Sequence, residues 1–349
     1  MDANPPDTTP QRSSRLLFHA GPPEGVTLHY ILFGPEGLRA GWSIILFVAI
    51  FVTLEHCVRP VFQYLLHTQP IKDGLLSTRQ TVSLELPSIV ALIVSMVLMA
   101  FVERRRLNSY GFARAHRARF FFGGLAWGLA LLSVLIFLLR LFGLLVFDPH
   151  QLTGAAALHY GLLWLLCFLL VALQEELHFR SYLQFTMTRG LRSIFRWFFG
   201  ERHSNTLGFW TAAFALSSYF GIGHNGNAGE SPIGLFSAAI AGLLFCLSLW
   251  RTGSLWWAIG FHTSWDWAQS FLYGVPDSGL MARGHLFATH AVGSPWLSGG
   301  VTGPEGSILF LPVALIGAGG ILLTLPRTHN GYLPLRSEDS SQDRVSILP

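Results

Sequence analysis

Long apolar stretches alternate with short polar ones along most of this chain. Eight blocks are dominated by Leu, Ile, Val, Phe and Ala, near 41–66, 84–102, 119–146, 158–189, 206–224, 232–250, 254–273 and 307–325. Most of them are close to the about 20 residues that an α-helix needs to cross a bilayer. The pattern therefore predicts an all-α fold, a polytopic transmembrane helical bundle with about eight spans.

Composition agrees with that pattern. Hydrophobic residues make up 51% of the 349 positions and charged residues only 12%, whereas soluble domains carry roughly 25% charged residues. So few charges cannot cover a water-exposed surface. The composition argues against a soluble enzyme, a disordered scaffold and a secreted disulfide framework.

The basic residues are distributed unevenly between alternate loops. Cytoplasmic loops of membrane proteins accumulate Lys and Arg. If the N-terminus lies inside, most arginines fall in inner loops and the tail, and the outer loops hold only Arg59, Lys72, Arg79 and Arg283. The net charge of +4 is then explained by the basic residues of the inner loops, and both termini are expected to be cytoplasmic. The expected partner is the lipid bilayer, and no nucleic acid is expected. The preference for Arg over Lys and the lack of a retention signal favour a bacterial inner (plasma) membrane.

The pattern divides the chain into five regions. They are a flexible cytosolic N-terminal arm (1–40), three N-terminal transmembrane helices (41–146), a candidate catalytic core (158–273), a last transmembrane helix (307–325) and a flexible cytosolic tail (326–349). Gly124 and Gly128 are spaced for close packing of the third helix on a neighbour. Aromatic residues among the arginines of 191–203 favour a helix lying in the inner interface.

Ionisable side chains interrupt three of the apolar blocks. Each costs about 2.5–3.5 kcal/mol at the centre of a span by insertion scales, so such residues are functional candidates. The fourth block contains Glu175, Glu176 and Arg180, the fifth ends at His224, and the seventh contains His262 and Asp266. Isolated polar residues elsewhere are interpreted as snorkelling or locally paired, namely Glu55, Glu85, Arg140, His159 and His178.

Helical spacing organises these candidates. Glu176 and Arg180 stand four residues apart, so they can form an ion pair, while Glu175 is turned about 100° away and stays free. His262 and Asp266 are also four apart, so the carboxylate can hold one ring nitrogen and leave the other for substrate or water. Spacing alone leaves a buried structural cluster open as an alternative for each group.

In these three motifs the sequence resembles the CPBP family of intramembrane endopeptidases, which includes CAAX prenyl proteases and bacteriocin-processing or immunity-type proteins. The family pattern is EExxxR, FxxxH and HxxxN or HxxxD on successive transmembrane helices. It is met here by Glu175, Glu176 and Arg180, by Phe220 and His224, and by His262 and Asp266. The resemblance covers roughly 158–273 and implies a catalytic core similar to the CAAX prenyl protease fold.

The resemblance implies a peptidase chemistry for these residues. Glu175 is expected to be the general base, with His224 sharing the attacking water. His262, supported by Asp266, is expected to face the oxyanion, and Glu176 with Arg180 to form a buried pair that holds the helix in register. The implied substrate is a peptide or lipidated protein, such as a prenylated CAAX-type C-terminus, a leader peptide or a small membrane protein.

Two positions depart from the family pattern. Ser181 follows Arg180 where many members have glycine. Asp266 stands where prenyl-protease members usually carry asparagine, whose amide can donate to an oxyanion. An ionised aspartate cannot donate. Asp266 must therefore be protonated or serve to orient His262.

Other chemistries remain open from the residues. Glu175, His224, His262 and Asp266 make an N/O ligand set that suits Zn²⁺. The sequence contains no HExxH, so a glutamate mechanism without metal or other cofactor is favoured over a metalloprotease. A non-catalytic immunity or binding module of the same family and a proton-coupled transporter are the alternative functions, although no inverted repeat supports the latter.

Overall fold

A computed structural model describes residues 28–34, 36–112 and 116–327. The chain forms two compact units, Met1–Arg39 and Ala40–Pro349. The first contains a short helix, α1 (Leu28–Leu32), and an antiparallel hairpin of β1 (Phe33–Gly34) and β2 (Gly37–Leu38). These elements belong to the predicted N-terminal arm, and the rest of that arm (1–27) lies outside the described residues. So does most of the predicted tail, 328–349.

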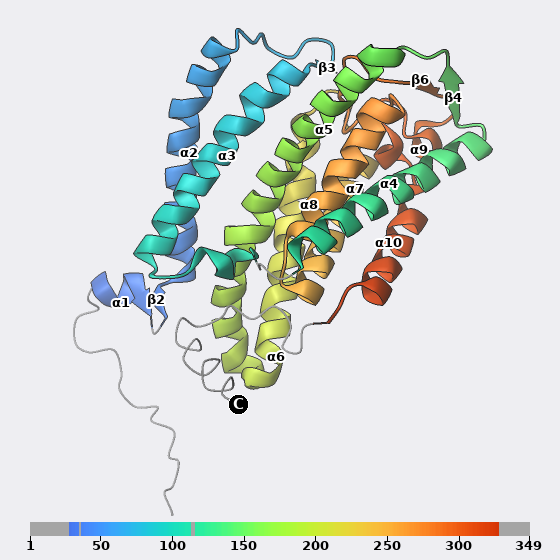
Figure 1. Ribbon diagram of the computed structural model, residues 1–349. Coiled ribbons are helices and arrows are strands. Elements are labelled where there is room, and N and C mark those ends of the chain that lie inside the picture. Colours follow the sequence, from blue (N-terminus) through green and yellow to red (C-terminus); the bar gives the residue numbers. More distant parts are fainter. Residues whose placement is uncertain (1–27, 35, 113–115, 328–349) are drawn as a thin grey trace, which may run out of the picture. The chain divides into compact units, whose positions relative to one another are not determined.

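Helices dominate the second unit (Figure 1). The α-helices are α2 (Ala40–Leu65), α3 (Thr78–Val102), α4 (Arg117–Leu141), α5 (Gly154–Glu176), α6 (Gln184–Gly223), α7 (Pro232–Thr252), α8 (Trp256–Asp266), α9 (Pro295–Ser298) and α10 (Phe310–Thr324). Short 3₁₀ turns are η1 (Leu107–Tyr110), η3 (His224–Gly226) and η5 (Pro304–Gly306), and η2 (Leu177–Leu183) and η4 (Trp267–Leu272) are π-helical. Each of the eight predicted apolar blocks contains a helix, so the predicted helical fold is confirmed.

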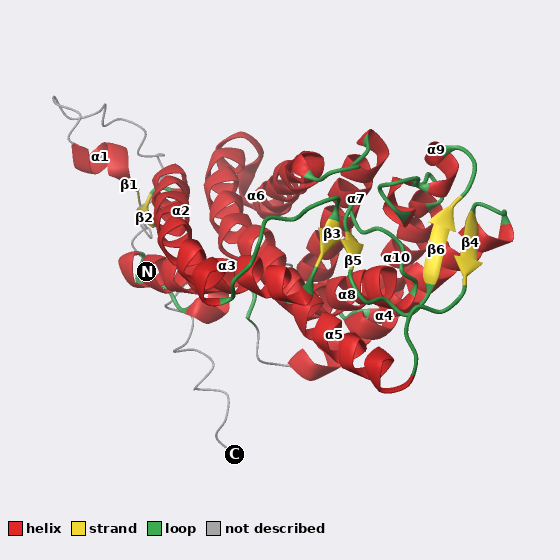
Figure 2. Cartoon of the chain, turned by 90° about the horizontal axis from the view of Figure 1, so that it is seen from above, coloured by secondary structure: helices red, strands yellow, loops and turns green. Residues whose placement is uncertain are grey.

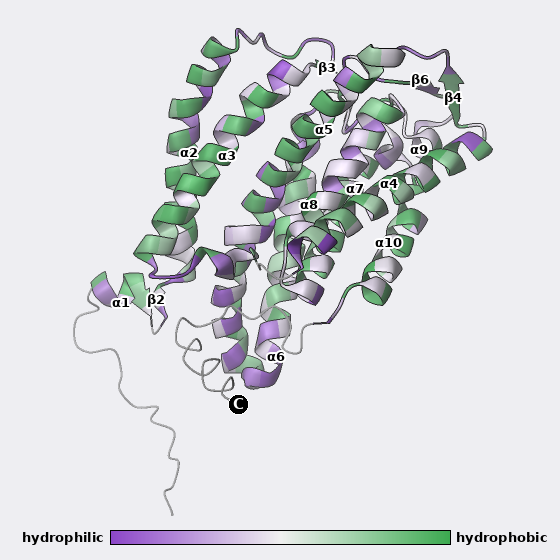
Figure 3. Ribbon diagram, in the orientation of Figure 1, coloured by the Kyte–Doolittle hydropathy of each residue, from purple (hydrophilic) through white to green (hydrophobic). Residues whose placement is uncertain are grey.

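The helices differ in length from the predicted spans. Within the described residues, five helical runs are long and apolar enough to cross a membrane, the longest being Gly154–Gly226. That run contains two of the predicted blocks. The seventh block is divided between α8 and the π-helix η4, and α10 has only 15 residues. Hydrophobic residues dominate the middle of α2, α3 and α10, as the colouring of Figure 3 shows, and α2 buries only Ser43, Phe47 and Phe51. Such uncovered apolar helices belong in a lipid bilayer.

The helix α6 is a hairpin of two limbs. Gly200 adopts φ 71° and ψ 177°, and the chain reverses there. The limbs pack so closely that a Cβ on Gly208 would lie 2.8 Å from the Arg192 backbone nitrogen and 3.0 Å from the Thr188 carbonyl oxygen. Residues 191–203 are therefore helical, as expected, and form the tip of this hairpin as part of α6.

Two small sheets tie the long segment after α8 to the helices. β3 (Leu75–Leu76) pairs in parallel with β5 (Met281–Ala282), and β4 (Leu145–Asp148) pairs antiparallel with β6 (Ala288–Ala291). Figure 2 shows both pairs among the helices. The apolar pattern did not predict these strands, because two to four residues carry no recognisable alternation. They hold the residues after α8 over the helical core.

The helices α4 and α8 approach each other at three glycines. A Cβ on Gly124 or Gly128 would clash with the backbone of Trp257 or Phe261, and a Cβ on Gly260 would clash with Phe121. The close packing predicted for Gly124 and Gly128 is thus confirmed, and its partner is the helix that carries His262. Around this contact α4, α7, α8 and α10 share a hydrophobic core.

We expect Gly128→Ala to lower the unfolding free energy by about 1–3 kcal/mol, because the added methyl group overpacks a rigid backbone contact. The variant should also lower catalytic activity, since it pushes α8, which carries His262, away from α4. Gly123→Ala is the matched control, because its Cβ would lie 3.9 Å from Trp257, an ordinary contact. Thermal unfolding in detergent measures both variants. Equal melting temperatures for the two variants would contradict the close-packing argument.

Candidate active site

Both helices that carry paired motif residues change to a π-helix directly after them. Glu175 and Glu176 end α5 before η2, and Asp266 ends α8 before η4. Within η2, Ser181 has φ −95° and ψ −105°, and its hydroxyl donates to the Tyr110 carbonyl at 2.8 Å. The Ser181 hydroxyl thus joins this kink to η1. π-turns inside α-helices often mark functional sites, because they re-aim the flanking side chains.

Glu176 is the buried centre of the polar cluster. Arg180 Nη1 donates to Glu176 Oε1 at 3.1 Å, so the ion pair expected from the spacing is present. Both side chains are essentially inaccessible to solvent. The guanidinium of Arg180 also lies over the Phe220 ring, 4.3 Å from its centroid. Phe220 belongs to the second motif, so this cation–π contact connects the helices of the first two motifs.

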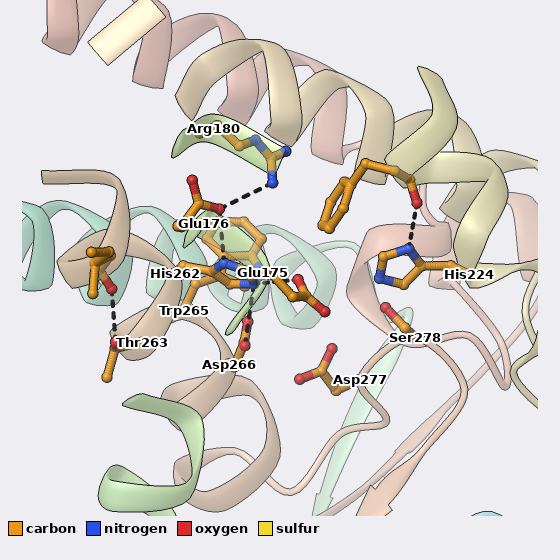
Figure 4. Close-up of polar contacts among 12 residues, drawn as sticks. Glu175, Glu176, Arg180, His224, His262, Thr263, Trp265, Asp266, Asp277 and Ser278 are labelled. Carbon is orange, nitrogen blue, oxygen red and sulfur yellow. Dashed lines mark hydrogen bonds and ion pairs between the residues drawn. The ribbon is translucent and has the colours of Figure 1, made fainter. Parts of the chain in front are cut away.

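His262 lies among three carboxylates. Its Nδ1 is 3.3 Å from Glu176 Oε1, and its Nε2 is 3.5 Å from both Glu175 Oε2 and Asp266 Oδ2. Figure 4 shows the ring between these groups. Asp266 was expected to hold one ring nitrogen and leave the other free. Instead, Glu176 of α5 faces Nδ1, and both Glu175 and Asp266 face Nε2. The Nε2 atom faces the side where Glu175 and Asp266 lie.

His224 reaches the same region from the end of α6. Its Nδ1 donates to the Phe220 carbonyl oxygen at 2.8 Å, which assigns the proton to Nδ1 in the neutral ring. The other nitrogen, Nε2, is then an acceptor. In Figure 4 this ring is directed toward the space beside Glu175.

These side chains line one cavity of about 320 Å³. Glu175, His224, His262 and Asp266 all contribute to its wall, together with apolar residues of α5, α7, α8 and α10. Glu176 and Arg180 do not line it and are buried behind His262. The structure thus brings the three motifs together. Four of their residues, Glu175, His224, His262 and Asp266, line the cavity, and the Glu176–Arg180 ion pair lies outside it.

Three further acidic residues line the cavity. Asp277 follows η4, Glu305 lies in η5, and Glu85 projects from α3. Glu85 was interpreted from the sequence as an isolated polar residue. The sequence pattern gave no signal for Asp277 and Glu305, which lie in the segments that connect the helices. Glu305 accepts hydrogen bonds from Trp265 Nε1 at 2.8 Å and from Ser278 Oγ at 3.2 Å, and so joins the loop to α8.

The four residues considered as zinc ligands lie around the cavity without converging on one point. Within the part of the chain that the structure describes, no group of three or more His, Cys, Asp or Glu side chains has the arrangement of a metal site. The arrangement offers instead a carboxylate, two imidazoles and several nearby acids around a space large enough for water and a peptide group.

In a comparison with family models, residues 157–268 match the family described as "Type II CAAX prenyl endopeptidase Rce1-like". The matched segment includes all seven motif residues, from Glu175 to Asp266. No curated protein and no solved structure matches the chain.

Proposed function

We propose that this chain, whose residues 157–268 match the Rce1-like type II CAAX prenyl endopeptidases, is a membrane-embedded protease of that family. It hydrolyses its substrate with a water molecule activated by Glu175. The observation that carries this proposal is the common cavity of Glu175, His224 and His262, with Glu176 and Arg180 buried behind it.

The proposed mechanism assigns one role each to Glu175, His224 and His262, the three side chains around the cavity. Glu175 takes a proton from water in the cavity, and Nε2 of His224 accepts the second hydrogen of that water. The water oxygen attacks the scissile carbonyl. Nε2 of His262, protonated and balanced by the carboxylates around it, donates to the developing oxyanion. Asp266 holds this ring from the same side.

Glu176 and Arg180 are positioning residues, which hold His262 in place. Glu176 fixes Nδ1 of His262, and Arg180 neutralises the buried carboxylate. The proposed chemistry requires no metal ion and no other cofactor.

The proposed substrate is a membrane-associated peptide, such as a prenylated C-terminus, a leader peptide or a small membrane protein. Apolar residues such as Phe168, Val171 and Leu244 line much of the cavity and suit a lipidated or transmembrane segment. We further propose a bacterial inner membrane as the location, with both termini cytoplasmic, on the basis of the arginine-rich alternate loops.

Incubation of the purified protein with a quenched prenyl-peptide and a set of membrane peptides tests this function. We expect cleavage of at least one peptide, with the same rate in the presence of a zinc chelator. A loss of activity with chelator, restored by Zn²⁺, would contradict the metal-free mechanism. No cleavage of any peptide would contradict the proposed protease function.

A further inference from the structure

We propose that Asp277, outside the three motifs, is a further catalytic residue of this site and donates the proton that the leaving amine needs. This inference rests on the proposed function, peptide hydrolysis with Glu175 as the base. An amine is a poor leaving group unless its nitrogen is protonated as the bond breaks. The three motifs supply a base and oxyanion donors, and a separate acid protonates the amine without the proton that Glu175 has taken from water.

Asp277 lies where such an acid is needed. It lines the same cavity as Glu175, His224 and His262. In Figure 4 its carboxyl group is directed toward the space next to the Glu175 carboxyl, on the side of the cavity away from Arg180. An acid and a base on two sides of a scissile bond are the arrangement that general acid–base hydrolysis requires.

The loop around Asp277 holds the carboxyl group in place. Backbone hydrogen bonds join Asp277 and Leu280 in both directions, at 2.7 and 2.8 Å. Ser270 of η4 donates to Asp277 Oδ2 at 3.3 Å, and the next residue, Ser278, is joined to Glu305. Parallel pairing of β3 with β5 holds the chain four residues further on. Asp277 is therefore part of a braced turn.

The surroundings of Asp277 favour its protonated form. Burial raises its pKa well above the usual aspartate range, and the carboxylates of Glu305 and Glu175 raise it further. The groups that face it from the packed elements are Glu175 of α5, Asp266 of α8, Glu305 of η5, Glu230 before α7, Glu85 of α3 and His224 of η3. His262 of α8 also lines the cavity, and Ser270 donates to Asp277, but no Lys or Arg lines the cavity among the described residues.

The proton transfers balance over one turnover. Glu175 takes one proton from water, and the hydroxide oxygen bonds to the carbonyl carbon. The carbon–nitrogen bond of the tetrahedral intermediate then breaks, and the nitrogen takes the proton of Asp277. The products are a carboxylic acid and a neutral amine. One proton passes from Glu175 back to Asp277 through cavity water and resets the site.

Two substrates that differ only in the leaving group test this assignment. We expect Asp277→Asn to lower kcat for a peptide amide by about 10²–10⁴-fold. The same variant should cleave the matching aryl ester within a few-fold of the wild-type rate, because a phenolate with a pKa of about 10 leaves more readily without a proton. Asp148→Asn is the control, since Asp148 is a half-exposed residue of β4 that pairs with His290.

A role for Asp277 that is only structural would slow amide and ester cleavage equally, and this result would overturn the inference. Amide cleavage by Asp277→Asn at the wild-type rate would overturn it as well, while the proposed protease function would stand. If the wild-type protein cleaves no peptide, both proposals fail. Asp277→Ala with the same amide-to-ester contrast replaces the asparagine variant if the latter does not fold.

Stability gives a readout that does not depend on turnover. A carboxyl group whose pKa is raised in the folded state stabilises the fold below its unfolded pKa, and this contribution is lost as the pH rises through the folded pKa. We therefore expect the melting temperature of the wild type to fall relative to Asp277→Asn as the pH rises above the usual aspartate range. A pH-independent difference between them would contradict a protonated Asp277.

Discussion

Glu175→Gln should lower peptide cleavage by about 10²–10⁴-fold, the usual contribution of a general base, and leave the fold intact. The amide is isosteric with the carboxyl group but cannot take a proton from water at neutral pH. The side chain of Glu175 is 22% exposed, toward the cavity, and its contact with His262 is 3.5 Å long. The melting temperature should therefore change little. Steady-state cleavage and thermal unfolding of the same preparation measure both quantities.

Glu55→Gln is the matched control for this prediction. Glu55 is also a helix glutamate of the apolar region, but it pairs with Arg59 and accepts from Ser88 at 2.7 Å, away from the cavity. We expect this variant to cleave at the wild-type rate. Activity of Glu175→Gln within a few-fold of the wild type would rule out Glu175 as the base.

The buried ion pair should dominate the stability of the site. We expect Glu176→Leu and Arg180→Met each to lower the unfolding free energy by about 3–5 kcal/mol, because each leaves one uncompensated charge inside the protein. Both side chains of the pair are almost completely buried, and the guanidinium also lies against the rings of Phe220 and Phe245. Denaturant or thermal unfolding in a fixed detergent gives the changes.

The double variant Glu176→Leu, Arg180→Met removes both charges. It should be less destabilised than the sum of the single variants, since neither charge is then left alone. Arg59→Met is the comparison on the exposed side, because it also breaks a glutamate–arginine pair four residues apart. Partly exposed pairs contribute about 0–1 kcal/mol. Additive losses in the double variant would show that Glu176 and Arg180 do not act as a pair.

Local spacing was sufficient to predict part of this site. A residue four positions along a helix lies on the same face, and the Glu176–Arg180 pair follows from that rule. The Gly124 and Gly128 pair likewise predicted a close helix contact. The resemblance over 158–273 supplied the expectation that the motifs meet, which spacing within one helix cannot give.

Contacts between segments far apart in the chain could not be predicted from the sequence. Nothing in the chain indicated that Glu176 of α5 would take the Nδ1 atom of His262 on α8. Asp277 and Glu305 come from connecting segments, where no periodicity shows which way a side chain points. Glu85 was set aside because its sequence neighbours offer no partner, and it reaches the cavity only because α3 packs beside α5.

An experimental structure of Glu175→Gln with an uncleaved peptide substrate tests the central claim most directly, since this variant binds the substrate but leaves it intact. The account predicts the scissile carbonyl in the cavity, with its oxygen within hydrogen-bond distance of His262 Nε2 and its carbon facing residue 175 and His224 across one water. A peptide bound elsewhere on the protein, with its scissile bond away from these side chains, would contradict the account.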